Sequence, residues 1–109
     1  MINWGDFEKI EMRAGTIISA AVFEKAKKPA YQLIIDFGEY GIKKSSAQIT
    51  VHYSTEELKG KQVIAVVNFP PRQIANFFSE CLVLGVYDEN NDVVLLQPGK
   101  QVKNGCKVG

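Results

Sequence analysis

Histidine, cysteine and arginine are scarce in this sequence, and their scarcity excludes several kinds of site. The chain has one histidine, His52, and two cysteines, Cys81 and Cys106, in no Cys-x-x-Cys or Cys/His ligand spacing. A Ser/His/Asp or Cys/His catalytic group is excluded unless His52 folds onto a cysteine, and no glycine-rich phosphate loop is present. We therefore predict a protein that is not an enzyme, binds no metal or cofactor, and keeps both cysteines as free thiols.

Long apolar runs and an excess of one charge are also missing. No apolar segment approaches the roughly 20 residues of a membrane span, and the N-terminal MINWGDFEKIEM carries charges where a secretory signal needs an apolar core. These features predict a cytoplasmic protein. The chain has 13 basic and 12 acidic residues, so a basic surface requires local segregation of charge.

The apolar content that is present suits one small β-domain spanning residues 1–109, since 46% of the residues are hydrophobic and no repeat or linker interrupts them. Alternating or continuous apolar runs bounded by turn residues predict strands, and the polar DENND segment predicts a hairpin turn. The predicted strands are 13–23, 31–38, 42–49 and 62–69, followed by a hairpin of 81–87 and 92–97.

Helix signals flank these strands. Ser54 and Glu57 have capping-box spacing and Gly60 is a helix stop, which predicts a short helix between the third and fourth strands. Asp6 is placed like the N-cap of a short helix or turn before the first strand, and Gly15 marks a bend, bulge or close approach within that strand. This order predicts an all-β fold with a short helix, a five-stranded OB-fold barrel with N- and C-terminal extensions.

The stretch NFPPRQIANFFSECLVLG, residues 68–85, is too apolar for an ordinary surface loop and too interrupted for a strand. We interpret it as a connection between buried strands that Pro70 and Pro71 stiffen. Neighbouring side chains of an extended chain point to opposite sides, so Phe77 and Phe78 cannot both point inward. One of them is expected to face a partner.

OB-fold barrels bind oligonucleotides on the face of their second and third strands and in the neighbouring loops. Seven polar or basic side chains are therefore candidates for RNA contact. They are Arg13, Lys43, Lys44, Gln48, Asn68, Arg72 and Ser79. Arg72 follows the two prolines on a stiffened backbone, and a guanidinium suits phosphate oxygens and base faces. Arg13 can equally pair with Glu8 or Glu11, and the amide and hydroxyl side chains can equally cap turns.

Lysines provide the remaining positive charge. Lys43 and Lys44 are adjacent in a strand, so only one of them can lie on a given face. Lys25, Lys27 and Lys28 form the densest basic cluster, in a loop that suits either phosphate contact or simple solvation.

Five aromatic residues are candidates for a peptide site or a subunit interface. They are Trp4, Phe7, Phe69, Phe77 and Phe78. Stacking on a base is worth about 1–3 kcal/mol, and burying a phenylalanine in any dry interface is worth about 1.5–3 kcal/mol, so energetics does not separate these roles.

Several blocks resemble one family in order and spacing. They are DFEKIEMRAGTI, SSAQIT, LKGKQVIAVVNFPPRQIANFFSECLVLG and VVLLQPGKQVKNGCKVG. They resemble the bacterial CsaA proteins, a stand-alone branch of the tRNA-binding-domain family that also includes the C-terminal domain of many methionyl-tRNA synthetases. The resemblance implies an OB-fold core, no catalytic activity, a role in protein export as a chaperone, and a homodimer joined partly through extensions 1–11 and 98–109.

One motif departs from the wider family. Synthetase-type domains tend to have S-x-G-M where this chain has Ser79, Glu80, Cys81 and Leu82. Our leading hypothesis is a non-catalytic protein that binds tRNA or other structured RNA by charge and shape. The alternative is a chaperone that binds unfolded or precursor polypeptides in an apolar groove.

Overall fold

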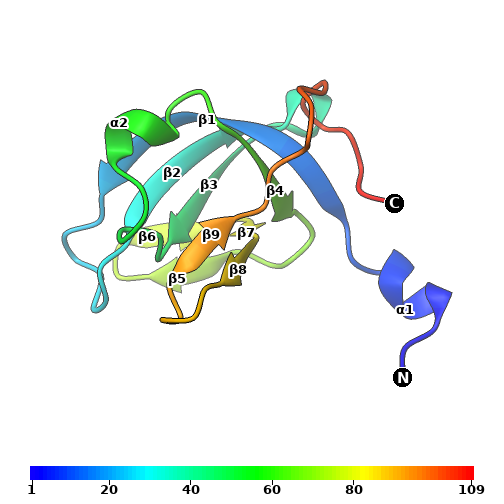
Figure 1. Ribbon diagram of the computed structural model, residues 1–109, viewed down its shortest axis with the longest axis horizontal. Coiled ribbons are helices and arrows are strands. Elements are labelled where there is room, and N and C mark those ends of the chain that lie inside the picture. The colour runs from blue at the N-terminus through cyan, green and yellow to red at the C-terminus, as the bar shows by residue number, and fades with distance from the viewer.

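A five-stranded antiparallel sheet curls into a nearly closed barrel in the computed structural model, which describes all residues 1–109 (Figure 1). Its strands follow the order β3-β2-β1-β4-β7. They are β1 (Met12–Val22), β2 (Tyr31–Asp36), β3 (Ile42–Ala47), β4 (Gln62–Val66) and β7 (Leu82–Val83). This arrangement confirms the predicted OB-fold class, with α2 (Thr55–Leu58) between β3 and β4.

The capping box predicted for α2 is confirmed. Ser54 Oγ accepts the Glu57 N–H at 3.2 Å, and Glu57 Oε1 accepts the Ser54 N–H at 2.7 Å. These bonds satisfy N–H groups that a helix start leaves without partners. Leu58 at the end of the helix is fully buried in the barrel core, so the helix covers one barrel end with an apolar side chain.

The N-terminal helix α1 (Trp4–Glu8) is present, but its predicted N-cap is wrong. Asn3 is the N-cap, and Asp6 occupies the third helical position. Asn3 Oδ1 accepts the Asp6 N–H at 2.9 Å and Asp6 Oδ2 accepts the Asn3 N–H at 3.1 Å, so an Asn/Asp pair replaces the usual Ser/Glu pair. Figure 1 shows α1 projecting away from the barrel, and none of its residues is buried.

Strand β1 is long enough to pair with β4 along its first half and with β2 along its second half. Gly15 permits a close approach, since a Cβ atom there would lie 2.6 Å from Phe37 and 2.7 Å from Ile35. The bulge lies further on, between Ile17 and Ser19. Bulges increase local twist, which helps a single strand serve both sides of a small barrel.

Residues 68–85 contain more strand than predicted. A hairpin of β5 (Arg72–Ile74) and β6 (Phe77–Ser79) interrupts the connection after β4, which itself ends at Val66 rather than at Phe69. The hairpin turn places Ala75 at φ 53°, a conformation that usually calls for glycine. The expected later hairpin is confirmed between β8 (Gly85–Tyr87) and β9 (Val93–Leu95). Its predicted first strand, 81–87, is divided, because Leu82 and Val83 belong to β7 and pair with β4.

The C-terminal arm, residues 98–109, pairs through residues 105–108 with the first half of β1. Ala14 accepts the Gly105 N–H at 2.8 Å and donates its own N–H to Cys106 at 2.9 Å, and Met12 accepts the Val108 N–H at 2.9 Å. The arm therefore pairs with β1 where β2 does not reach.

A buried side chain clamps the same arm. Gln62 is 6% exposed, and its amide both donates to the Val102 carbonyl at 2.6 Å and accepts the Val102 N–H at 3.1 Å. A third bond joins Gln62 Nε2 to Asn104 Oδ1 at 3.1 Å. The side-chain amide of Gln62, the first residue of β4, thus takes the place of main-chain pairing and holds the arm against that strand.

The 3-10 helix η1 (Gly38–Tyr40) completes the elements, and none of the helices is both long and apolar enough to cross a membrane.

Candidate nucleic-acid interface

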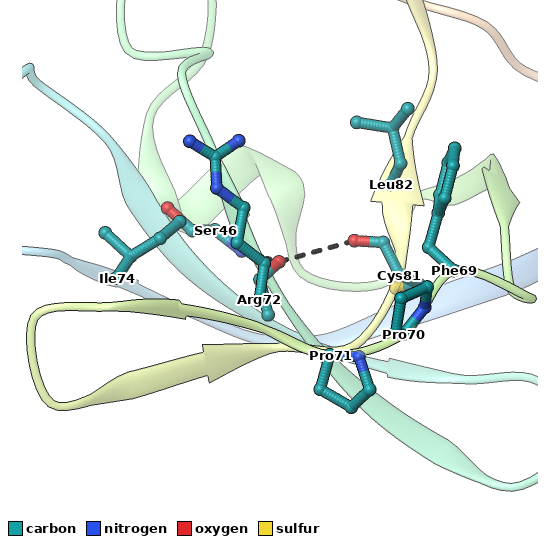
Figure 2. A pocket seen from close by; sticks show the side chains of 9 residues that line it. Ser46, Phe69, Pro70, Pro71, Arg72, Ile74, Cys81 and Leu82 are labelled. Carbon is teal, nitrogen blue, oxygen red and sulfur yellow. Dashed lines mark hydrogen bonds between the residues drawn. The ribbon is translucent and has the colours of Figure 1, made fainter.

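A pocket of about 500 Å³ opens beside the β5–β6 hairpin (Figure 2). Its lining comes from β3, the β4–β5 connection, the hairpin and β7. The lining residues are Ser46, Phe69, Pro70, Pro71, Arg72, Ile74, Ser79, Cys81 and Leu82. Three side chains predicted from the sequence, those of Phe69, Arg72 and Ser79, thus meet at one site. Its volume lies within the range of ligand pockets.

The hairpin register explains which of its side chains reach the pocket. Arg72 pairs with Ser79 and Ile74 pairs with Phe77, so these four side chains share one face of the hairpin. Pro70 and Pro71 precede β5 and line the pocket beside it. The stiffened segment predicted from the two prolines therefore carries part of the pocket wall.

Side chains complete the hydrogen bonding between β3 and residues 79–81, where the barrel closes. Ser79 Oγ accepts the Ser46 N–H at 3.0 Å, and Glu80 Oε1 accepts the Lys44 N–H at 2.9 Å. The Glu80 N–H donates to the Lys44 carbonyl at 2.7 Å. The carboxylate of Glu80 is thus a hydrogen-bond acceptor in the barrel seam.

The departure from S-x-G-M falls on the pocket. Ser79, Cys81 and Leu82 all line it, while Glu80 lies in the seam. The Ser45 hydroxyl donates to the Cys81 carbonyl at 3.0 Å, which fixes the pocket floor. Cys81 and Leu82, the two positions that differ from the expected S-x-G-M pattern, therefore line the pocket.

The two arginines differ in their surroundings. Arg13 forms an ion pair with Glu11 at 2.6 Å, donates to the Gly105 carbonyl at 2.8 Å, and lies 3.6 Å from the centre of the Tyr40 ring. Its side chain is only 11% exposed. Arg72 is exposed and has no ion-pair partner in the structure. Of the two guanidinium groups, only that of Arg72 is free to meet a ligand.

Asn68 and Gln48 occupy different settings. Asn68 Nδ2 donates to the Lys9 carbonyl at 2.7 Å and Asn68 Oδ1 accepts the Glu11 N–H at 3.0 Å, so its amide ties the N-terminal arm, residues 1–11, to the barrel. Gln48 is exposed just beyond the end of β3. Neither of these two residues lines the pocket.

Lys43 and Lys44 point to opposite faces of β3, as their adjacency predicts. Lys43 is half-buried, whereas Lys44 is exposed and its Nζ atom lies 5.3 Å from the centre of the Phe77 ring. Lys44 is therefore the member of this pair on the hairpin side of the barrel.

The three hairpin-region phenylalanines divide as the alternation of side chains predicts. Phe77 is buried and its ring centre lies 5.3 Å from that of Phe23. Phe78 and Phe69 are 48% and 55% exposed. Of the remaining aromatic candidates, Trp4 is 81% exposed.

The contact between Phe23 and Phe77 joins two segments of the chain that the sequence pattern does not bring together. Together with Ala30, these residues form a small second core that joins both ends of the loop 23–30 to the hairpin. The loop carries the exposed cluster Lys25, Lys27 and Lys28. A buried aromatic pair thereby holds the densest basic segment beside the pocket-bearing hairpin.

The two cysteines are both free, as expected. Burial raises the pKa of the Cys81 thiol to about 11, so this thiol stays protonated at neutral pH although it lines the pocket. The sulfur contacts the Lys44 carbonyl at 3.8 Å. Cys106 is exposed on the C-terminal arm.

His52 does gain a partner that sequence spacing conceals. Its Nε2 atom lies 2.7 Å from Asp88 Oδ2, and Asp92 is close to both. Backbone N–H groups, led by that of Asp92, and the His52 ring hold the pKa of Asp88 below its ordinary value. Asp88 Oδ1 also accepts the Asn90 and Asp92 N–H groups, so this cluster closes the turn of the β8–β9 hairpin.

Comparison with known proteins gives one consistent result. Residues 12–107 match the tRNA binding domain family. The chain is 52% identical to the chaperone CsaA of Bacillus anthracis, with a TM-score of 0.95 over 100% of this chain and 99% of that one. It is 51% identical to the CsaA chaperone protein of Picrophilus torridus, with a TM-score of 0.94 and full coverage of both chains.

Among curated relatives, the chain is 34% identical to the methionine--tRNA ligase of Methanococcoides burtonii over 96% of its length, but it spans only 15% of that enzyme. The ligase match is thus to a small part of a much longer protein. The chain belongs to the tRNA binding domain family, in the branch of the CsaA chaperone proteins.

Proposed function

We propose that this protein binds tRNA or another structured RNA without catalysing a reaction on it. The match of residues 12–107 to the tRNA binding domain family carries the proposal. The exposed, unpaired guanidinium of Arg72 beside the pocket supports it, because a guanidinium offers several donors suited to phosphate oxygens.

Positive charge near the hairpin supplies the electrostatic part of binding. Lys25, Lys27 and Lys28 lie in the loop that Phe23 and Phe77 anchor, and Lys44 lies on the same side of the barrel. Contacts of this kind fix the position of an RNA backbone but do not identify its sequence. The recognition is therefore mainly of charge and shape, despite a net charge of only +1.

The protein acts as a homodimer in this proposal, joined partly through residues 1–11 and 98–109. The N-terminal arm supports this, because α1 buries none of its residues and Trp4 is 81% exposed. An indole left in water is unusual unless a partner covers it. Two modest RNA sites on one dimer gain avidity without new contacts.

The salt dependence of binding tests the RNA proposal. Each phosphate neutralised by a lysine or arginine releases counterions, so the logarithm of tRNA affinity should fall linearly with the logarithm of salt concentration. Fluorescence anisotropy with labelled tRNA over a range of salt concentrations measures the slope. A tRNA affinity that does not change with salt would contradict electrostatic recognition.

Polypeptide binding is the second candidate function. Its support is the chaperone designation of the CsaA relatives, together with the exposed side chains of Phe69, Phe78 and Leu82. Apolar association holds or strengthens in salts that favour burial, which is opposite to the RNA expectation. Binding of an unfolded, labelled polypeptide that persists in high sulfate, with no tRNA bound at low salt, would favour this function instead.

A further inference from the structure

We infer that the pocket beside the β5–β6 hairpin accepts one unstacked nucleobase of the RNA, held between Phe69 and Arg72. The inference rests on the proposed function and adds to it a contact that does not depend on phosphate charge. It concerns an extruded or single-stranded base, because the faces of bases within a duplex are already stacked.

The walls of the pocket have the right chemistry for a flat aromatic ligand. Figure 2 shows Arg72 on one side of the pocket and Leu82 and Phe69 on the other. Phenyl rings and guanidinium planes both stack on bases. Phe69 is 55% exposed, so its ring is available without rearrangement of the core.

The floor of the pocket offers polar groups for the edge of a base. Ser46 and Ser79 both line it. The Ser79 hydroxyl accepts the Ser46 N–H at 3.0 Å, and the Ser46 hydroxyl makes no hydrogen bond within the chain. A hydroxyl can donate or accept, so Ser46 suits several bases and implies weak preference among them.

Charge favours a nucleotide over an apolar peptide side chain as the occupant. The lining includes one cation, Arg72, and no acidic residue. The nearby carboxylate of Glu80 is bonded to the Lys44 N–H in the seam. A nucleotide carries a phosphate that this positive rim attracts, whereas an apolar side chain leaves the guanidinium without a partner.

Paired oligonucleotides test the inference. A short single-stranded RNA and an oligomer of equal length made of abasic ribose phosphates carry the same charge but differ in bases. The wild-type protein should bind the base-containing oligomer about 5- to 150-fold more tightly, which corresponds to one stacked base at about 1–3 kcal/mol. Equal affinities for the two oligomers would overturn the inference.

Two exposed phenylalanines provide a matched control. Phe69→Ala should abolish the difference between the two oligomers, whereas Phe78→Ala should preserve it, because Phe78 pairs with Gln73 on the hairpin face away from the pocket. Equal effects of the two substitutions would contradict a base in this pocket. Thermal unfolding monitored by circular dichroism confirms that both variants are folded.

Arg72→Lys separates stacking from charge. This substitution keeps the positive charge but loses the planar group, so the preference for the base-containing oligomer should fall while the salt slope stays the same. An unchanged preference for the base-containing oligomer would show that Arg72 does not stack on the base.

The outcomes for tRNA distinguish this inference from the proposed function. If tRNA binds with the expected salt slope but bases make no difference, the pocket inference alone fails. If neither tRNA nor either oligomer binds, both fail. Displacement of the oligomers by an unfolded apolar polypeptide, without any preference for bases, would assign the pocket to a peptide.

Discussion

The hydroxyl of Ser79 accepts the backbone N–H of Ser46 at 3.0 Å, across the line where the barrel closes. In a regular sheet a backbone carbonyl would occupy this position. Glu80 plays the same part for the Lys44 N–H at 2.9 Å. The closure of this barrel thus depends on the identity of two side chains, and the same segment lines the candidate RNA pocket.

Ser79→Ala should lower the free energy of unfolding by about 1–3 kcal/mol, because it leaves the half-buried Ser46 N–H without an acceptor. Urea denaturation measures the loss. Ser46→Ala is the matched control, since the Ser46 hydroxyl has no bond to lose, and Ser79→Thr should restore most of the stability. A Ser79→Ala variant as stable as wild type would show that the bond contributes little.

Substitution of the two arginines should affect different properties. Arg72→Glu should weaken tRNA binding by about 1–3 kcal/mol and leave the melting temperature unchanged, because Arg72 is exposed and unpaired. Arg13→Met should lower the free energy of unfolding by about 1–3 kcal/mol, because it breaks the bonds to Glu11 and Gly105. Anisotropy and thermal melting on both variants check the pair. A large drop in melting temperature for Arg72→Glu would make Arg72 structural.

Removal of residues 1–5 should weaken the proposed dimer while leaving the barrel folded, because Trp4 makes no buried contact within its own chain. Light scattering over a concentration series measures the dimer, with Trp4→Ala as a milder version of the same change. A monomeric full-length protein at micromolar concentration would contradict both the dimer and the avidity argument.

One thiol per chain should react quickly with a chromogenic disulfide reagent at neutral pH, and Cys106→Ser should abolish the fast reaction. Cys106 is exposed, whereas Cys81 is buried with a pKa raised from 9.0 to about 11. Fast labelling of two thiols in the wild-type protein would show that the pocket floor opens readily.

The raised pKa of the Cys81 thiol makes the free energy of unfolding depend on pH. A folded-state pKa above the unfolded value means that the folded state holds the proton more tightly. The resulting stabilisation is present below about pH 9 and is lost as pH rises toward 11. Cys81→Ala should therefore unfold with a shallower loss of stability across this alkaline range than the wild-type protein.

Much of the fold follows from local sequence signals. Ser54 and Glu57 specify the start of α2 by their spacing, and the adjacency of Phe77 and Phe78 predicts that one is buried and one exposed. The β5–β6 hairpin is not predicted by these signals, because its turn has Ala75 at positive φ, where glycine would be the usual signal. The sequence does not single out Asn3 as the N-cap, because the nearby Asp6 is a residue type that caps helices equally well.

The site is less predictable, because its arrangement depends on distant partners. The sequence offers Glu8 or Glu11 as a partner for Arg13, but only the folded chain reveals that Glu11 and the Tyr40 ring together occupy its guanidinium. Asn68 likewise holds the backbone of Lys9 and Glu11, which are far away along the chain. Which candidate side chains are free to bind a ligand thus depends on long-range contacts, and the spacing of residues along the sequence does not predict them.

The pairing of the C-terminal arm with β1 bears on how the chain folds. The bond between Arg13 and Gly105 joins residues 92 positions apart, so closing this loop costs more entropy than forming the hairpins. The arm should therefore dock late, after β1 has paired with β4. Until it docks, the first half of β1 is an open edge, and this is where aggregation during refolding is expected to begin.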